Sequence, residues 1–310
     1  MPLLDWIGAR ARWFLALGVI AALIIPGPGA LLDGTVPFWV AVLYGLAMTR
    51  IDLGAVARRA LVPRRLLRNL GLLALLMAAT PALALGIGVA TGLPQPLIEA
   101  LVYTTAAPPL GSATAFCLML GLNAAFALEL TVLGSLIAPL SMPLVTGVLL
   151  GEALPVEAGE MLLRLATLIG LATVGAIAAR ILLTPARIER HARSFDGMAS
   201  LILVLFLFPL FHGMTDLIAQ RPGFALACLI AAFIANIGVQ ALSFAATRRI
   251  AGAETGGAVS LVWGNRNAAL TLAFLPEAPL ITLYIALYQF PMYLTPLVMR
   301  PIIGPPRPER

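Results

Sequence analysis

Three consecutive polar residues, Asn265, Arg266 and Asn267, interrupt the apolar stretch AVSLVWGNRNAALTLAFLP at positions 258–276. At ~1.5 Å per residue, Arg266 lies roughly 14 Å into a predicted membrane span, near the centre of a ~30 Å hydrocarbon layer. A charged side chain there costs ~2.5–3.5 kcal/mol, so it normally faces a partner, a cavity or a ligand. Because a guanidinium binds carboxylates, sulfonates and phosphates through paired hydrogen bonds, the stretch predicts an anion-binding centre.

Glu129 is a second charge within a predicted span, about 9 Å from its start at ~1.5 Å per residue. It could pair with Arg266 in the absence of substrate, or carry a proton as part of ion coupling. On a helix, however, Glu129 does not share the face that Ala127 and Thr131 share at i, i+4. A structural role, against another helix or toward the cytoplasm, therefore stays open, and Thr131 is the second candidate for ion coupling.

Weaker candidates lie on other predicted spans. Asn236 and Gln240 share one helix face, which predicts hydrogen bonds to a neighbouring helix or, alternatively, a cavity wall. Tyr288 could line the same cavity or anchor the membrane interface. Cys117 and Cys228 lie within apolar spans and are expected to pack as small apolar residues. No metal cluster, cofactor motif or nucleic-acid footprint is recognisable, so we expect none of these partners.

The composition predicts a membrane protein. Of 310 residues, 61% are hydrophobic and only 11% are charged, and the mean hydropathy is +0.99. Windows of about 20 apolar residues predict ten helices embedded in the lipid bilayer and a single transmembrane domain over residues 1–310. These spans are 13–32, 36–52, 69–91, 97–121, 124–150, 161–183, 197–217, 224–246, 257–276 and 278–299.

The basic residues predict the orientation of these spans. All 20 are arginines, and most fall before the first span, after the second, between the sixth and seventh, between the eighth and ninth, and after the tenth. In a ten-span protein these segments share one side, and cytoplasmic loops are enriched in Arg and Lys. We therefore expect a multi-pass protein of the cell inner membrane with both termini in the cytoplasm.

Two predicted spans carry helix-breaking residues at their centres. The fourth has Pro108, Pro109 and Gly111, and the ninth has Gly264, so both should unwind at mid-depth. Five spans plus five, with the fourth of each broken, predict two inverted repeats, residues 1–155 and 156–310, whose broken helices cross. Secondary transporters of this layout bind substrate where the broken helices meet.

The second half of each broken helix would then begin at this crossing. We place these starts near Ser112 to Thr114 and near Asn267, where unpaired N–H groups and positive dipole ends favour an anion. The predicted substrate-binding residues are Arg266, Asn267, Asn265, Ser112 and Thr114.

The same segments resemble a known family. The runs APPLGSAT at 107–114, LN at 122–123 and LIAPLSMP at 136–143 are similar to the fourth and fifth helices of the bile acid:sodium symporter family, and residues 263–270 are similar to its ninth helix. The resemblance extends over essentially the whole chain. It implies the fold described above, an all-α membrane protein of ten helices, and transport of organic anions.

The departures from the family pattern concern its two sodium sites. The glutamate shared by both sites falls on Val262, a glutamine ligand falls on Arg266, and the glutamine of the third helix falls on Leu76. A serine of the fifth helix falls on Ala127, whereas Thr131 is retained. Most ligand oxygens are thus missing and a guanidinium stands in their place, so we expect a distant, sodium-independent member.

These observations predict a secondary-active or facilitative transporter of bile-acid-like anions, small carboxylates or sulfonates, working by alternating access, with Arg266 replacing a sodium site. The coupling ion stays open, protons being preferred to sodium. The alternatives are an ordinary sodium-coupled symporter, an arsenite-type efflux carrier that uses Cys117, and a non-transporting membrane sensor. We do not expect an enzyme, because no paired aspartates, Ser-His set or His-Glu-x-x-His motif is recognisable.

Overall fold

The computed structural model is all-helical and describes residues 2–25, 27–32, 34–151, 156–275 and 278–303. In chain order its helices are α1 Pro2–Ala9, α2 Ala11–Ile24, α3 Gly27–Leu31, α4 Val36–Thr49, α5 Leu53–Ala60, α6 Pro63–Ala74, η1 Leu75–Ala79, α7 Thr80–Ala90, α8 Gln95–Ala106, α9 Ser112–Met119, α10 Ala124–Leu150, α11 Ala158–Leu183, α12 Pro185–Arg190, α13 Ala192–Phe211, α14 Met214–Gln220, α15 Pro222–Phe233, η3 Ile234–Gly238, α16 Val239–Ala251, α17 Ala253–Gly264, η4 Ala268–Ala273, α18 Pro279–Val298 and α19 Arg300–Ile303. Pro276, the predicted end of the ninth span, lies outside the described residues.

Six of these helices, counted over the described residues, are long and apolar enough to cross a membrane, which indicates a multi-pass membrane protein. The bent pair α4 and α5 would raise the number to seven. The prediction of ten spans is therefore not confirmed. The helices α2 and α4 have only 14 residues each, and two of the predicted spans are interrupted.

Both predicted interruptions are confirmed. The helix α8 ends at Ala106, and Ala107 is extended, at φ −62° and ψ 150°, because a residue before proline avoids the helical region. The helix α17 ends at Gly264 and is followed by extended Asn265. After this second break the chain forms η4, a 3₁₀-helix of 6 residues. The second half-helix thus begins at the predicted place, with Asn267 directly before its first residue, but it is a short 3₁₀-helix and not an α-helix.

Two long helices share an irregularity that the sequence did not indicate. The helix that spans residues 63–90 begins with 12 α-helical residues, followed by the 5-residue π-helix η1. The helix that spans residues 222–251 likewise begins with 12 α-helical residues and continues into the 5-residue π-helix η3. In each case the next helix along the chain, α8 or α17, is the one that breaks.

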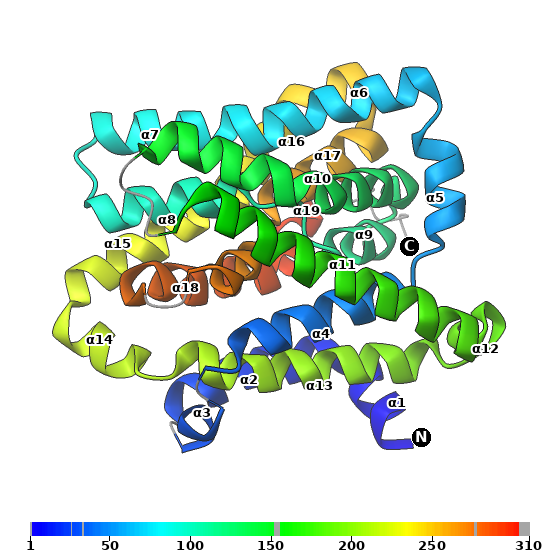
Figure 1. Cartoon of the computed structure of the whole chain (residues 1–310), viewed down its shortest axis with the longest axis horizontal. Helices are drawn as coiled ribbons and strands as arrows, with labels where there is room; N and C mark the ends of the chain where they lie inside the picture. Colours follow the sequence, from blue (N-terminus) through cyan, green and yellow to red (C-terminus); the bar gives the residue numbers. More distant parts are fainter. Residues whose placement is uncertain (1, 26, 33, 152–155, 276–277, 304–310) are drawn as a thin grey trace.

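The helices form two groups. One group contains α2, α4, α11 and α13, which pack on one another, and Figure 1 shows α4 and α13 along the lower side of the molecule. The other group contains α7 to α10 and α15 to α18, including both interrupted helices. The 3₁₀-helix η4 contacts both α4 of the first group and α8 of the second. The second break therefore lies against the boundary between the groups.

The short helix α5 connects the two groups at one end of the molecule. It turns by 75° from α4, and Figure 1 shows it at the right edge, at the same end as α12 and the N-terminus. Asp52 caps α5 by accepting a hydrogen bond of 2.8 Å from the Ala55 N–H. That hydrogen bond lowers the pKa of Asp52, helped by nearby Arg180. The segments rich in arginine that follow α4 and α11 thus lie at one end, whereas the last arginines of the chain, Arg307 and Arg310, lie outside the described residues.

Candidate functional site

The extended segments of the two breaks pair with each other, and we call this contact, residues 107–110 with 265–267, the helix crossing. Pro109 and Arg266 form an antiparallel β-bridge. The Leu110 N–H donates to the Asn265 carbonyl at 2.9 Å, and the Asn267 N–H donates to the Pro108 carbonyl at 2.9 Å. Backbone groups that left the helices are therefore satisfied across the crossing, as a membrane interior requires.

The guanidinium of Arg266 holds three backbone carbonyls around this crossing. Its Nε donates to Trp263 at 2.8 Å, its Nη1 to Ala107 at 3.1 Å and its Nη2 to Leu76 at 2.7 Å. Trp263 and Ala107 lie at the C-terminal ends of α17 and α8, which carry partial negative charge. Leu76 lies in the π-helix η1. The cation thus joins both broken helices to the irregular turn of a third helix.

This cation has no acidic counterpart within the described part of the chain. Arg266 is only 2% exposed, and none of the ion pairs between described residues includes it. Carbonyl dipoles stabilise the guanidinium without neutralising it. A unit positive charge therefore remains in surroundings of low polarity, where an anion would be strongly attracted.

A buried network of polar side chains fixes the end of α17. The amide of Asn236 donates to the Gly264 carbonyl at 2.8 Å, and the Tyr288 hydroxyl donates to the same carbonyl. The Asn265 amide donates to the Leu261 carbonyl at 2.9 Å. Asn265 and Asn236 are both fully buried, so Asn265 supports the break and does not itself face a solvent-filled space.

The network extends from η3 to α18. Gln240 donates to the Asn236 side-chain oxygen at 2.8 Å, and the Thr295 hydroxyl lies 3.2 Å from the Asn265 side-chain oxygen. This confirms the prediction that Asn236 and Gln240 bind neighbouring helices. Thr295 was missed, because a threonine next to prolines near the end of an apolar helix gives no sequence signal of its own.

Two glycines allow the close approach of helices at the crossing. A Cβ atom on Gly264 would lie 2.3 Å from Cγ of Gln240 and 2.5 Å from the Asn236 carbonyl oxygen. A Cβ atom on Gly134 of α10 would lie 2.7 Å from Cδ of Pro109. The absence of a side chain at these two positions therefore sets the distance between the breaks and the helices behind them.

The other predicted substrate residues lie around the crossing without bonding to Arg266. Ser112 is the first residue of α9, as expected, and Asn267 is half-buried beside the bridge. The hydroxyl oxygens of Thr114 and Thr131 are buried, and neither has a hydrogen-bond partner in the described structure. Since α9 packs against α10, both hydroxyls remain candidates for contact with an ion or a substrate.

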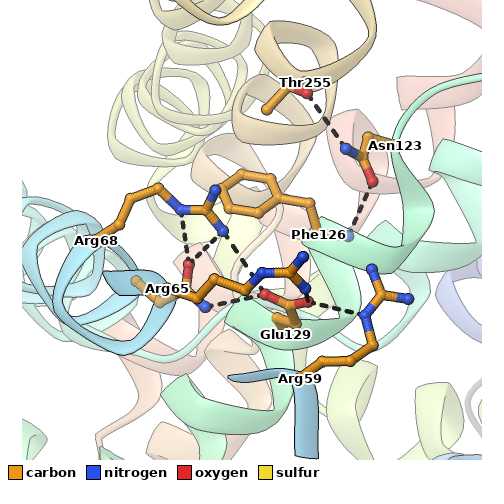
Figure 2. A network of polar contacts seen from close by, with 8 residues as sticks. Arg59, Arg65, Arg68, Asn123, Phe126, Glu129 and Thr255 are labelled. Atoms are coloured by element: carbon orange, nitrogen blue, oxygen red, sulfur yellow. Dashed lines mark hydrogen bonds and ion pairs between the residues drawn. The ribbon is translucent and has the colours of Figure 1, made fainter. Parts of the chain in front are cut away.

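Glu129 does not pair with Arg266, which corrects one of the roles considered for it. Figure 2 shows Arg59, Arg65 and Arg68 converging on its carboxylate, with Nε of Arg59 at 3.4 Å. Glu129 is 3% exposed and also accepts a hydrogen bond of 3.1 Å from Asn69. The interpretation that Glu129 faces another helix is therefore confirmed, since these partners belong to α5 and α6.

Three of the positions at which the family resemblance places sodium ligands are apolar and closed. Val262, Leu76 and Ala127 are all fully buried. The Arg266 guanidinium reaches the backbone of Leu76, at the aligned position of a family ligand. No group of His, Cys, Asp or Glu residues suitable for a metal ion occurs among the described residues.

Comparison of the chain with known protein families finds no matching family, and comparison with curated proteins finds no match.

Proposed function

We propose that the protein is a transporter of organic anions, either bile-acid-like molecules or small carboxylates and sulfonates. One observation carries the proposal: two interrupted helices pair their extended segments around the buried, uncompensated charge of Arg266. Non-helical backbone at membrane depth is tolerated where it is buried in protein or lines a cavity, and secondary transporters use such breaks to bind their cargo.

The proposed architecture is that of ten helices in two inverted repeats, residues 1–155 and 156–310. Its support is the matched order of irregularities: twelve helical residues, a π-helix of five residues, and then a broken helix, once in each half. In this arrangement α2 and α4 count as short spans, and both termini lie in the cytoplasm at the inner membrane. The positive-inside rule supports that orientation, because α5 and α12 carry clustered arginines.

In this proposal Arg266 provides permanently the positive charge that sodium ions provide in the bile acid:sodium symporter family. The three aligned ligand positions that became apolar, Val262, Leu76 and Ala127, support it. So does the hydrogen bond from the guanidinium to Leu76. A fixed cation at this place would repel sodium and attract a carboxylate.

Transport requires that the anion reach Arg266, which is closed off in the present conformation. A guanidinium has five N–H donors, and three of its hydrogen bonds go to carbonyls. A movement of the group that contains α4 relative to the crossing would expose the remaining donors, because α4 contacts η4 directly. Ser112, Thr114 and Asn267 lie beside this route. Opening alternately to the two sides of the membrane completes the cycle.

The test is uptake by proteoliposomes that contain the purified protein. The panel consists of labelled taurocholate, a 2-oxo acid and a short alkyl sulfonate, with protein-free liposomes as the blank. At least one anion should enter, Arg266→Gln should abolish its uptake, and Arg266→Lys should retain part of it. Uptake of an anion at the wild-type rate by Arg266→Gln would refute the role of the charge. A variant counts only if it elutes as a monodisperse peak.

A sodium-coupled symporter is the second candidate, because the buried hydroxyls of Thr114 and Thr131 have no hydrogen-bond partner among the described residues and could bind a cation. Thermal unfolding of the purified protein in sodium chloride, compared with potassium and choline chloride at equal ionic strength, separates the two candidates. An ion that binds the native state raises the midpoint by mass action. A shift specific to sodium would favour the symporter, and equal midpoints would favour the fixed cation.

A further inference from the structure

A second concentration of charge lies away from the helix crossing, at the junction of α5, α6 and α10. Arg59 of α5 and Arg65 and Arg68 of α6 surround Glu129 of α10 (Figure 2), at 3.4, 3.7 and 3.7 Å. We call these four residues, together with Asn69, the arginine cluster. Three guanidinium groups face one carboxylate, so the ion pairs between described residues leave an excess of two positive charges in the cluster. A further carboxylate, Asp52, lines the same hollow as Arg59 but forms its ion pair with Arg180.

The cluster has a fixed part and an accessible part. Arg68 donates through Nε and Nη2 to the Asn69 side-chain oxygen, at 3.2 and 3.1 Å. Its guanidinium also lies over the Phe126 ring, at 4.6 Å. The side chains of Arg59 and Arg65, in contrast, form an ion pair with the carboxylate and no other ion pair or hydrogen bond among the described residues, and they are 55% and 46% exposed. Most of their N–H donors therefore remain available on the surface.

The place of the cluster identifies the kind of anion that can reach it. It lies where α5 meets the start of the long apolar helix at residues 63–90, which in the proposed orientation is the level of the membrane surface. Two exposed apolar residues, Leu61 and Val62, form the turn between Arg59 and Arg65, with exposed fractions of 59% and 45%. Leu67 and Leu70 are also exposed, but at 100° per residue they lie on the face of α6 opposite Arg65 and Asn69. A ligand bound by Arg59 and Arg65 thus meets the cations together with the apolar turn between them.

We propose that the arginine cluster binds the phosphate of an anionic phospholipid, whose acyl chains begin at the exposed apolar turn formed by Leu61 and Val62. Glu129 orients Arg59 and Arg65 from beneath, and their remaining donors hold the phosphate oxygens in charge-assisted hydrogen bonds. A free phosphate ion would gain the same hydrogen bonds but no apolar contact. The bound lipid would link α5 to α6 and stabilise the 75° turn that leads into α5.

The test is thermal unfolding of the full-length purified protein in mild detergent with added dioleoyl phosphatidylglycerol, phosphatidylcholine or inorganic phosphate. Phosphatidylglycerol should raise the midpoint, and phosphatidylcholine with the same acyl chains should not. The Arg59→Gln/Arg65→Gln variant should lose most of this shift, with an apparent affinity weaker by about tenfold or more, since each arginine near an anionic surface contributes about 1 kcal/mol.

The matched control is Arg58→Gln/Arg64→Gln, which removes the same charge from the adjacent positions of the same two helices. The control should keep the shift, because neither Arg58 nor Arg64 has an ion pair with Glu129 in the described structure. If both variants lost the phosphatidylglycerol shift equally, the lipid would be attracted by surface charge in general, and the proposed site would be overturned. An equal shift with inorganic phosphate would overturn the assignment to a lipid. If a double variant does not purify as a folded protein, the single variants Arg59→Gln and Arg58→Gln provide the same comparison.

Discussion

The helix crossing and the arginine cluster each contain a buried charge, but the two charges have opposite signs and different kinds of partner. At the crossing a cation has no carboxylate partner among the described residues, and three backbone carbonyls surround it. In the cluster a carboxylate, Glu129, has three cations. The crossing is closed, with Arg266 only 2% exposed, whereas the arginines of the cluster are about half exposed.

This difference separates two uses of arginine. At the crossing the guanidinium of Arg266 replaces helical hydrogen bonds that the breaks have removed. Most of its donors therefore bind the backbone, and only the remaining ones are available to a ligand. In the cluster, water solvates most of the donors, so the excess charge costs little and stays available to an external anion. We therefore expect substitutions at the crossing to affect stability more, and substitutions in the cluster to respond more to salt.

The largest effect is expected for Arg266→Leu. It leaves the carbonyls of Leu76, Ala107 and Trp263 without a donor in an apolar interior, and each unsatisfied group costs about 1–3 kcal/mol. We expect a loss of roughly 3 kcal/mol or more, measured by thermal or denaturant unfolding in detergent. Arg50→Leu is the control, because Arg50 forms a partly exposed pair with Asp196 and such pairs contribute about 0–1 kcal/mol. Equal losses in the two variants would mean that the crossing does not depend on the guanidinium.

A smaller effect is expected for Gly264→Ala, which tests the packing of the crossing without changing its charge. The new Cβ atom would lie 2.5 Å from the Asn236 carbonyl oxygen, and such overpacking typically costs about 1–3 kcal/mol. In the control Gly170→Ala, nothing lies within 4 Å of the new atom. That change should be neutral or stabilise α11 by about 0.5–1 kcal/mol, because alanine favours helices. A stable Gly264→Ala protein would contradict the close contact between α17 and η3.

The smallest effect is expected for Glu129→Gln in the arginine cluster. The hydrogen bond from Asn69 can persist, and water can solvate the half-exposed arginines, so we expect a loss of about 1 kcal/mol. The measurement is the unfolding midpoint of both proteins at low and at high salt. The difference in midpoint between Glu129→Gln and the unaltered protein should change with salt. The difference between Arg266→Leu and the unaltered protein should stay constant, because buried interactions are screened much less. If salt changed both midpoint differences equally, the crossing and the cluster would not differ in their exposure to screening, and the comparison would be wrong.

The sequence predicts the two breaks because proline and glycine act locally. Pro108, Pro109 and Gly264 interrupt their helices wherever those helices pack, and the structure confirms both positions. The burial of Arg266 follows in the same way from its place within an apolar stretch. The partners of Arg266 cannot be predicted from the sequence, because every residue has a backbone carbonyl. Nothing in the identity of Leu76 indicates that its carbonyl accepts from a residue 190 positions away.

Other features depend on packing between distant segments. The 75° turn before α5 brings Arg59 to Glu129, and a hydropathy window cannot detect it. The π-helices η1 and η3 follow ordinary apolar residues. The half-helix predicted to begin near Asn267 is present as η4, but its 3₁₀ geometry and its length of 6 residues do not follow from the apolar residues that form it. Pairing between helices, more than local preference, decides these features.

The central claim is that the charge of Arg266 selects an anion at the helix crossing. The most direct measurement uses the unaltered protein in proteoliposomes and compares the uptake of a transported carboxylate with that of its neutral primary amide, which has nearly the same shape. We predict that the carboxylate enters at least about tenfold faster, because an unpaired buried cation adds more than 1.4 kcal/mol to its binding. Equal rates for the acid and its amide would contradict the account.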